Sequence, residues 1–120
     1  MGTISLTALA ASEASNYFKF SLEGRDDRYF DVSNGVYNSD WNNPTVVEVT
    51  YSNLNATNRA YLSVTGSRDW PQDNVMSDVV MVDGNVERSI YYKTDFILRL
   101  MVYLYATTDD DVTFQGYWSP

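Results

Sequence analysis

The chain has 120 residues, 44% of them hydrophobic, which is enough for one domain over residues 1–120 with a core of its own. It contains neither His nor Cys, which excludes imidazole and thiolate metal ligands, His general bases, Cys nucleophiles and disulfides. Sixteen acidic residues against eight basic ones give a net charge of -8, and such a surface disfavours nucleic acid and anionic membranes as partners.

The N-terminal segment, residues 3–11, is apolar but short and rich in hydroxyl groups, and the first positive charge is Lys19. A secretion signal has a charged region ahead of a longer apolar one, so we expect no signal peptide in this chain. No run approaches the roughly 18 apolar residues of a membrane span. Residues 6–15 fit a short helix, and residues 4–8 equally fit a strand. We expect residues 3–9 to pair with a sheet edge, either of the same subunit or of a neighbour.

Apolar side chains at every second position are typical of half-buried strands, and this pattern recurs along the chain. It predicts strands over residues 16–23, 28–33, 45–52 and 59–65. The core faces hold Phe18, Phe20 and Leu22 in the first, Val47, Val49 and Tyr51 in the third, and Ala60, Leu62 and Val64 in the fourth. Asn34-Gly35 follows the second strand, and both residues tolerate positive φ, which predicts a hairpin turn there.

Residues 66–75 lack alternation and are predicted to form a long loop that carries Trp70 and Pro71. A strand is predicted over residues 77–82, and Asp83-Gly84 predicts a second hairpin turn, leading into residues 85–93. A last strand over residues 112–118 directs Val112, Phe114 and Trp118 inward and Thr113, Gln115 and Tyr117 outward.

Residues 94–107 are apolar on both alternating faces. One face holds Phe96, Leu98, Leu100, Val102 and Leu104, and the other holds Ile97, Arg99, Met101, Tyr103 and Tyr105. Helical spacing fits some of these positions, but the cleaner alternation and the many aromatic and branched residues favour a central strand.

The count is eight or nine short strands, with turns every ten residues or so. This spacing is typical of antiparallel sandwiches and not of β-α-β units. The sequence therefore predicts an all-β fold, a single antiparallel β-sandwich of jelly-roll or immunoglobulin-like outline.

Aromatic residues make up 15% of the chain, and several tyrosines lie opposite the best apolar set of their own strands. These are Tyr17, Tyr61, Tyr91, Tyr103, Tyr105 and Tyr117. Tyrosine presents an apolar ring and a polar tip at small entropic cost, which suits recognition. Three interpretations are open. The tyrosines are buried inside one sandwich, or they form a subunit interface, or they form a platform on which sugars stack, with Trp41 or Trp70 as the main stacking residue. For Trp70 the alternatives are capping the end of the sandwich or contacting a partner.

Without His and Cys, carboxylates are the remaining acid/base groups. A glycosidase needs two carboxyl groups that face each other at a separation of roughly 5–9.5 Å. Sequence does not choose a pair among Glu13, Glu23, Glu48, Glu87 and the aspartates, which we interpret as solvated, so no catalytic residue is predicted. Asp109, Asp110 and Asp111 form an oxygen-rich turn that suits calcium, with a solvated turn as the alternative.

These features predict a non-enzymatic structural or surface module that packs against copies of itself, such as a virion or extracellular-filament subunit. The alternative is a carbohydrate-binding module or small lectin, with or without calcium. The expected partners are the chain itself, as a homo-oligomer, or carbohydrate, and the expected location is extracellular or on a virion surface. No other cofactor, no nucleic acid and no membrane insertion is expected.

Overall fold

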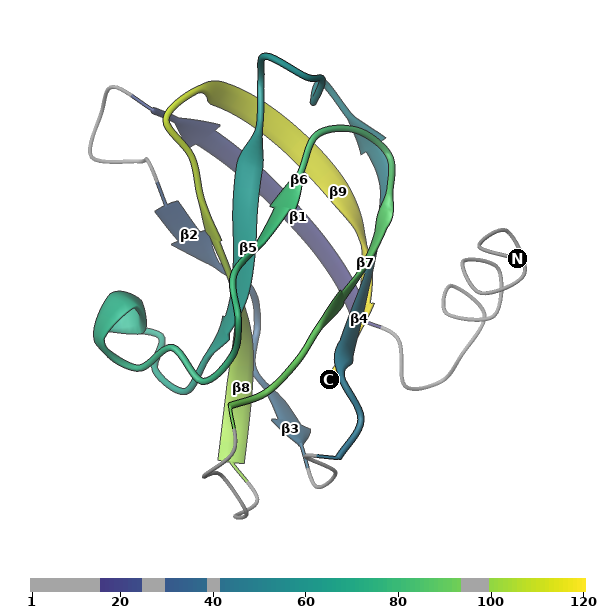
Figure 1. Cartoon of the computed structure of the whole chain (residues 1–120). Coiled ribbons are helices and arrows are strands. Elements are labelled where there is room, and N and C mark those ends of the chain that lie inside the picture. Colours follow the sequence, from purple (N-terminus) through teal and green to yellow (C-terminus); the bar gives the residue numbers. More distant parts are fainter. Residues whose placement is uncertain (1–15, 25–29, 39–41, 94–99) are drawn as a thin grey trace.

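The computed structural model describes residues 16–24, 30–38, 42–93 and 100–120, and nearly all of its regular structure is β (Figure 1). The strands are β1 (Asn16–Glu23), β2 (Phe30–Val32), β3 (Val36–Asn38), β4 (Thr45–Ser52), β5 (Ala60–Thr65), β6 (Val80–Val82), β7 (Glu87–Ile90), β8 (Leu100–Thr107) and β9 (Asp111–Ser119). A single 3-10 turn, η1 (Pro71–Asp73), lies between β5 and β6. The predicted all-β sandwich is confirmed.

Two antiparallel sheets pack face to face, as seen in Figure 1. The first, here called the β9 sheet, has the order β1-β9-β4-β7. The second, the β8 sheet, has the order β2-β8-β5-β6, and β3 also pairs with β8. If β2 and β3 count as one interrupted strand, the first strand pairs with the last, the second with the seventh, the third with the sixth and the fourth with the fifth. This is the wrapping of a jelly roll, and it differs from the strand order of an immunoglobulin domain.

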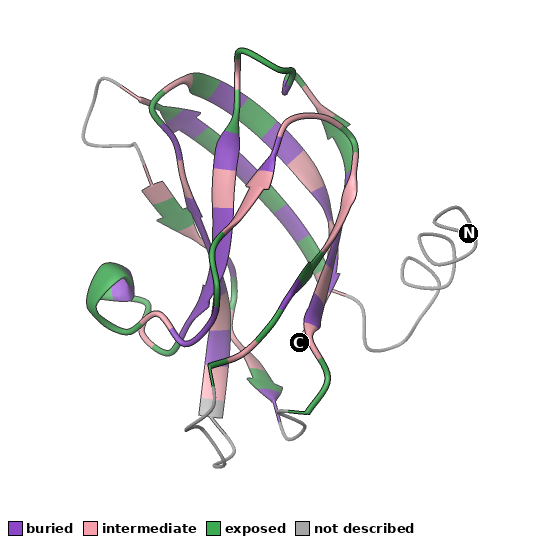
Figure 2. Cartoon of the chain, in the orientation of Figure 1, coloured by how far each residue is buried: buried purple, intermediate pink, exposed green. Residues whose placement is uncertain are grey.

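The core lies between the sheets and is formed by the side chains that point inward at every second position of the strands (Figure 2). The predicted inward sets of β1, β5 and β9 are confirmed, and the residues are Phe18, Phe20, Leu22, Ala60, Leu62, Val64, Val112, Phe114 and Trp118. In β1 the buried rings of Phe18 and Phe20 both contact Phe114, with ring centroids 6.0 Å and 5.5 Å away. A face that must exclude water explains why alternation predicts these strands well.

The predicted central strand over residues 94–107 is confirmed as strand β8 over its described part, Leu100–Thr107. Val102 and Leu104 are fully buried, as predicted, and the helical alternative is wrong for this part. Phe96, Ile97, Leu98 and Arg99 lie outside the described residues, as do Trp41 and the N-terminal segment before Asn16. The strands predicted over 77–82 and 85–93 are shorter, as Val80–Val82 and Glu87–Ile90, and in the described part of 28–33 the strand is Phe30–Val32.

The hairpin predicted at Asn34-Gly35 is wrong. Both β2 and β3 pair with β8, so the chain continues in one direction through these residues instead of reversing. Val32 pairs with Tyr105 and Val36 with Val102, so four steps on one side match three on β8. The extra residue makes a bulge, where Ser33 exchanges hydrogen bonds with Leu104: its backbone N–H donates to Leu104 O at 2.9 Å and its Oγ accepts from Leu104 N–H at 2.9 Å.

The hairpin predicted at Asp83-Gly84 is also wrong. These residues connect β6 in the β8 sheet to β7 in the β9 sheet, so the flanking strands do not pair with each other. Arg88 holds this crossing, because its Nε donates to Met81 O at 3.0 Å and its Nη2 lies 3.6 Å from the Asp83 carboxylate. Neither predicted turn has a residue with positive φ.

Tyr51 points outward, against the prediction that it aligns with Val47 and Val49 in the core. The pairing of β4 with β9 shifts register between Val49 and Tyr51, so Thr50 is an extra residue. Such a bulge reverses which face the following residues take. Tyr51 is therefore 70% exposed on the outer face of the β9 sheet, whereas Val47 and Val49 are buried.

Candidate functional site

The seven aromatic residues predicted to make contacts do not share one surface. Tyr17 and Tyr117 lie on the outer face of the β9 sheet, and Tyr91 is exposed just after β7. On β5 and β8 of the other sheet, Tyr61 and Tyr103 are half-buried, while Tyr105 is buried with its ring 6.0 Å from that of Phe30. The seventh residue, Trp70, lies on the loop before β6. A role in contacts stays a prediction for the exposed members.

The outer face of the β9 sheet carries a tyrosine platform formed by Tyr17, Tyr117 and Tyr51. Tyr17 and Tyr117 are cross-strand partners whose rings meet edge to face, with centroids 6.0 Å apart and planes at 70°. Tyr51 pairs with Gln115, two residues from Tyr117 on the same face, so it lies on the diagonal next to that ring. Sequence reasoning missed Tyr51, because alternation alone does not reveal the bulge.

A pair of glutamates continues the row Tyr17–Tyr117 across the sheet. Glu48 pairs with Tyr117 on one side and with Glu87 on the other. Glu48 is only 8% exposed, so the interpretation of this residue as solvated is wrong. Glu48 Oε1 and Glu87 Oε2 are both buried and have no hydrogen-bond partner among the described residues. Burial and, secondarily, the negative charge of Glu87 raise the pKa of the Glu48 carboxyl above its ordinary value of 4.5.

Replacing Glu48 by Gln is expected to stabilise the protein at neutral pH. A raised folded-state pKa means that deprotonation costs more in the folded than in the unfolded chain, so stability is lost as pH rises through the folded pKa. Gln keeps the shape and removes that charge. We expect the thermal midpoint of E48Q to exceed that of the wild type at about pH 7.5 and to match it near pH 4. A wild-type advantage at the higher pH contradicts this, and exposed Glu23 of the same face supplies the control variant E23Q.

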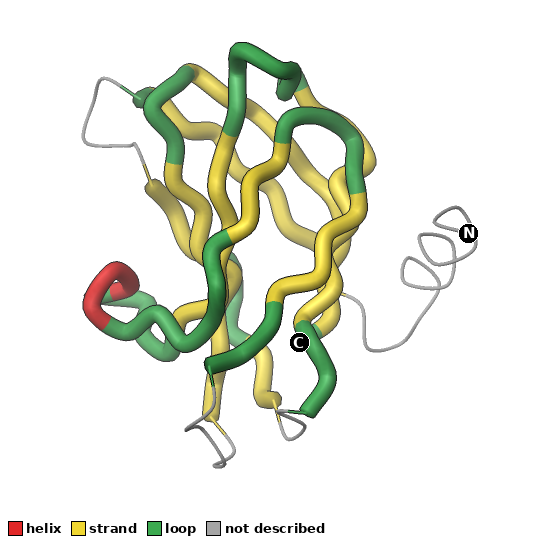
Figure 3. The backbone as a smooth tube through the Cα atoms, in the orientation of Figure 1, coloured by secondary structure: helices red, strands yellow, loops and turns green. Residues whose placement is uncertain are grey.

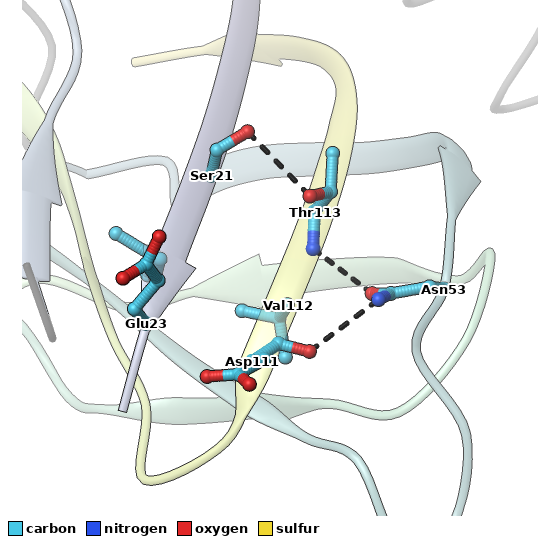
Figure 4. Close-up of a pocket in the computed structure, with 7 residues that line it drawn as sticks. Ser21, Glu23, Asn53, Asp111, Val112 and Thr113 are labelled. Carbon is cyan, nitrogen blue, oxygen red and sulfur yellow. Dashed lines mark hydrogen bonds between the residues drawn. The ribbon is translucent and has the colours of Figure 1, made fainter. Parts of the chain in front are cut away.

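A hollow of about 300 Å³ lies on the same outer face, at the end of β1 and the start of β9 (Figure 4). Its lining is Ser21, Leu22, Glu23, Asn53, Asp111, Val112 and Thr113. Asn53 Oδ1 accepts from Thr113 N–H at 2.9 Å, and Asn53 Nδ2 donates to Asp111 O at 3.4 Å, which ties the loop after β4 to β9. Hydroxyl and carboxylate groups therefore line a shallow polar site, of a size at the lower end of small-molecule pockets.

Trp70 stands on a hydrogen-bonded loop that contains the single 3-10 turn of the described residues, red in Figure 3. Its side chain is 65% exposed, so the interpretation that it caps the sandwich is wrong. Its backbone is held on both sides, because its N–H donates to Ser67 Oγ at 3.1 Å and its carbonyl accepts from Asn74 Nδ2 at 2.8 Å. Pro71 beneath it is buried, and its carbonyl accepts from Thr65 Oγ1 at 2.9 Å. An indole on such a support is positioned for contact at small entropic cost.

The three aspartates predicted as calcium ligands lie around the β8–β9 turn without converging. Asp110 Oδ2 accepts from Arg59 N–H at 3.2 Å, and Asp111 begins β9 and lines the hollow. Within the described ranges, no group of three or more acidic residues is arranged to hold a metal ion.

The described part of the chain contains no helix with the length and apolarity of a membrane span. Four features of the described surface bear on function: the tyrosine platform, the glutamate pair and the hollow on the β9 sheet, and Trp70 on a loop of the β8 sheet. Comparisons with protein-family models, with curated proteins and with solved structures found no match.

Proposed function

We propose that this protein is a non-enzymatic structural or surface subunit that assembles with copies of itself, of the kind found in virions or extracellular filaments. The supporting observation is that large aromatic side chains are exposed on separate surfaces of one small fold. Tyr17 and Tyr51, 54% and 70% exposed, lie on the outer face of the β9 sheet, whereas Trp70 lies on a loop of the β8 sheet. An assembly that grows beyond a dimer needs two different surfaces on each copy.

The chemistry of these surfaces also supports contacts between proteins. Tyrosine and tryptophan are enriched at the energetic centres of interfaces, with polar residues around them. Lys19 and Gln115 lie beside the tyrosine platform, and Arg68 and Asp69 precede Trp70. Because each copy carries a net charge of -8, repulsion between copies is expected to weaken assembly at low ionic strength and to be screened by salt.

Replacing Trp70 or Tyr51 by Ser is expected to reduce assembly without loss of stability. Both side chains are mostly exposed, so each unfolding free energy should change by no more than about 0.5 kcal/mol. Sedimentation velocity at several concentrations should show smaller species for W70S and Y51S than for the wild type. Q72A, an exposed neighbour of Trp70, is the matched control. Wild-type-like sedimentation of both variants contradicts the proposal.

The second candidate is carbohydrate binding by the outer face of the β9 sheet. It is supported by the hollow lined with hydroxyls and carboxylates, which is continuous with the tyrosine platform through the Lys19–Gln115 row of the sheet. Sugars stack their apolar faces on aromatic rings and hydrogen-bond their hydroxyls to such groups. Calorimetric titration with neutral oligosaccharides distinguishes the two candidates. Carbohydrate binding is favoured if the wild-type chain stays monomeric and binds saturably, and if Y51S abolishes that binding.

A further inference from the structure

The glutamate pair on the outer face of the β9 sheet is a place where the fold brings two like charges together. Glu48 and Glu87 are direct cross-strand partners, and directly opposed like charges destabilise a sheet. Each carboxyl has one buried oxygen with no hydrogen-bond partner in the described residues. A buried polar atom in that state costs free energy, and a positive charge beside the pair would offset the repulsion between the two carboxyls.

Among the residues that the structure describes, no cationic side chain forms an ion pair with either glutamate. The neighbouring side chains on this face are Tyr117 and then Tyr17, with Lys19 one row away on β1. Arg88, next to Glu87 in sequence, alternates to the other side, where its guanidinium bonds Met81 O and Asp83. That contact is the only ion pair within the part of the chain that the structure describes.

The neighbours of the pair also indicate what kind of cation fits. A calcium ion needs six to eight oxygen ligands, and no third acidic ligand converges here among the described residues. The adjacent group is instead the ring of Tyr117, and the faces of tyrosine rings attract organic cations. A guanidinium group fits best, since its planar fork donates to two carboxyl oxygens while its face stacks on an aromatic ring.

We infer that Glu48, Glu87 and Tyr117 form a binding site for a guanidinium group, such as the side chain of an arginine presented by a ligand. Both carboxyls accept from the fork, and the edge-to-face contact with Tyr17 holds the Tyr117 ring in place. The site is formed within a single chain, and it shares Tyr117 with the tyrosine platform proposed for assembly.

The test is a titration of the isotope-labelled full chain with N-acetylargininamide, followed through the backbone amide resonances of Glu48, Glu87 and Tyr117. N-acetylcitrullinamide, which has the same shape but a neutral urea, is the matched control ligand. We expect saturable shifts with the arginine compound only, and affinity at least about tenfold weaker in E48Q and in E87Q. The two variants are used together, with thermal midpoints showing that each one folds.

Three results would overturn the inference. The first would be equal binding of the citrulline and arginine compounds, and the second would be wild-type affinity in both glutamine variants. The third would be that calcium chloride shifts the same resonances at a lower concentration than the arginine compound does. The titration reports on amides of a single chain, so failure to bind the arginine compound would leave the assembly proposal standing. A protein that stays monomeric but binds the arginine compound would contradict assembly and support the guanidinium site.

Discussion

Replacing Gly116 by Ala is expected to lower the free energy of unfolding by about 3 kcal/mol or more, because it overpacks the centre of the β9 sheet. A Cβ at this position would overlap the carbonyl oxygen of Glu48 on the neighbouring strand. Gly116 lies in the middle of β9 and pairs with Phe18 and Val49, directly beside the β4 bulge. The backbone of β4 is paired on both sides and cannot move aside as a flexible side chain can. The clash is therefore relieved only if hydrogen bonds between paired strands break.

Gly84 gives the matched control for this substitution. A Cβ added there meets no atom within 4 Å, so G84A should be neutral or slightly stabilising through its effect on the unfolded chain. Urea unfolding of the two variants and the wild type provides the measurement. Similar midpoints for G116A and G84A would contradict the close approach of β4 to β9 at Gly116.

Replacing Phe114 by Ala is expected to cost about 3–5 kcal/mol through lost transfer free energy and the cavity left behind. Phe114 is fully buried and contacts the rings of Phe18 and Phe20. Its neighbour Gln115 points to the opposite face, so Q115A should change stability by no more than about 0.5 kcal/mol. Equal losses at the two positions in thermal or urea unfolding would contradict the register of β9.

Sequence reasoning succeeded where one face of a strand must exclude water. The inward residues of β1, β5 and β9 were predictable because a one-residue slip would move every apolar side chain into solvent. The path of the chain at Asn34-Gly35 and Asp83-Gly84 was not predictable. Local turn residues carry no information about which distant strand pairs with the segments before and after them. At Asn34-Gly35 the answer depends on β8, about seventy residues later in the chain.

The candidate site was less predictable than the fold for a similar reason. Glu48 and Glu87 become partners only through the pairing of β4 with β7, and Tyr51 faces outward only because of the β4 bulge. One signal was present in the sequence: Gly116 within an otherwise regular strand, since glycine inside a strand marks a bulge or a close approach of backbone. The exposure of Trp70 depends on the hydrogen bonds of its loop, for which alternation carries no information.

Self-assembly of the wild-type protein can be measured through its mass in solution. Static light scattering over a range of concentrations, at physiological ionic strength, reports the weight-average mass without a variant or a ligand. Self-assembly predicts a mass that exceeds the 13.7 kDa of one chain and rises with concentration. A constant 13.7 kDa across the whole range would contradict it.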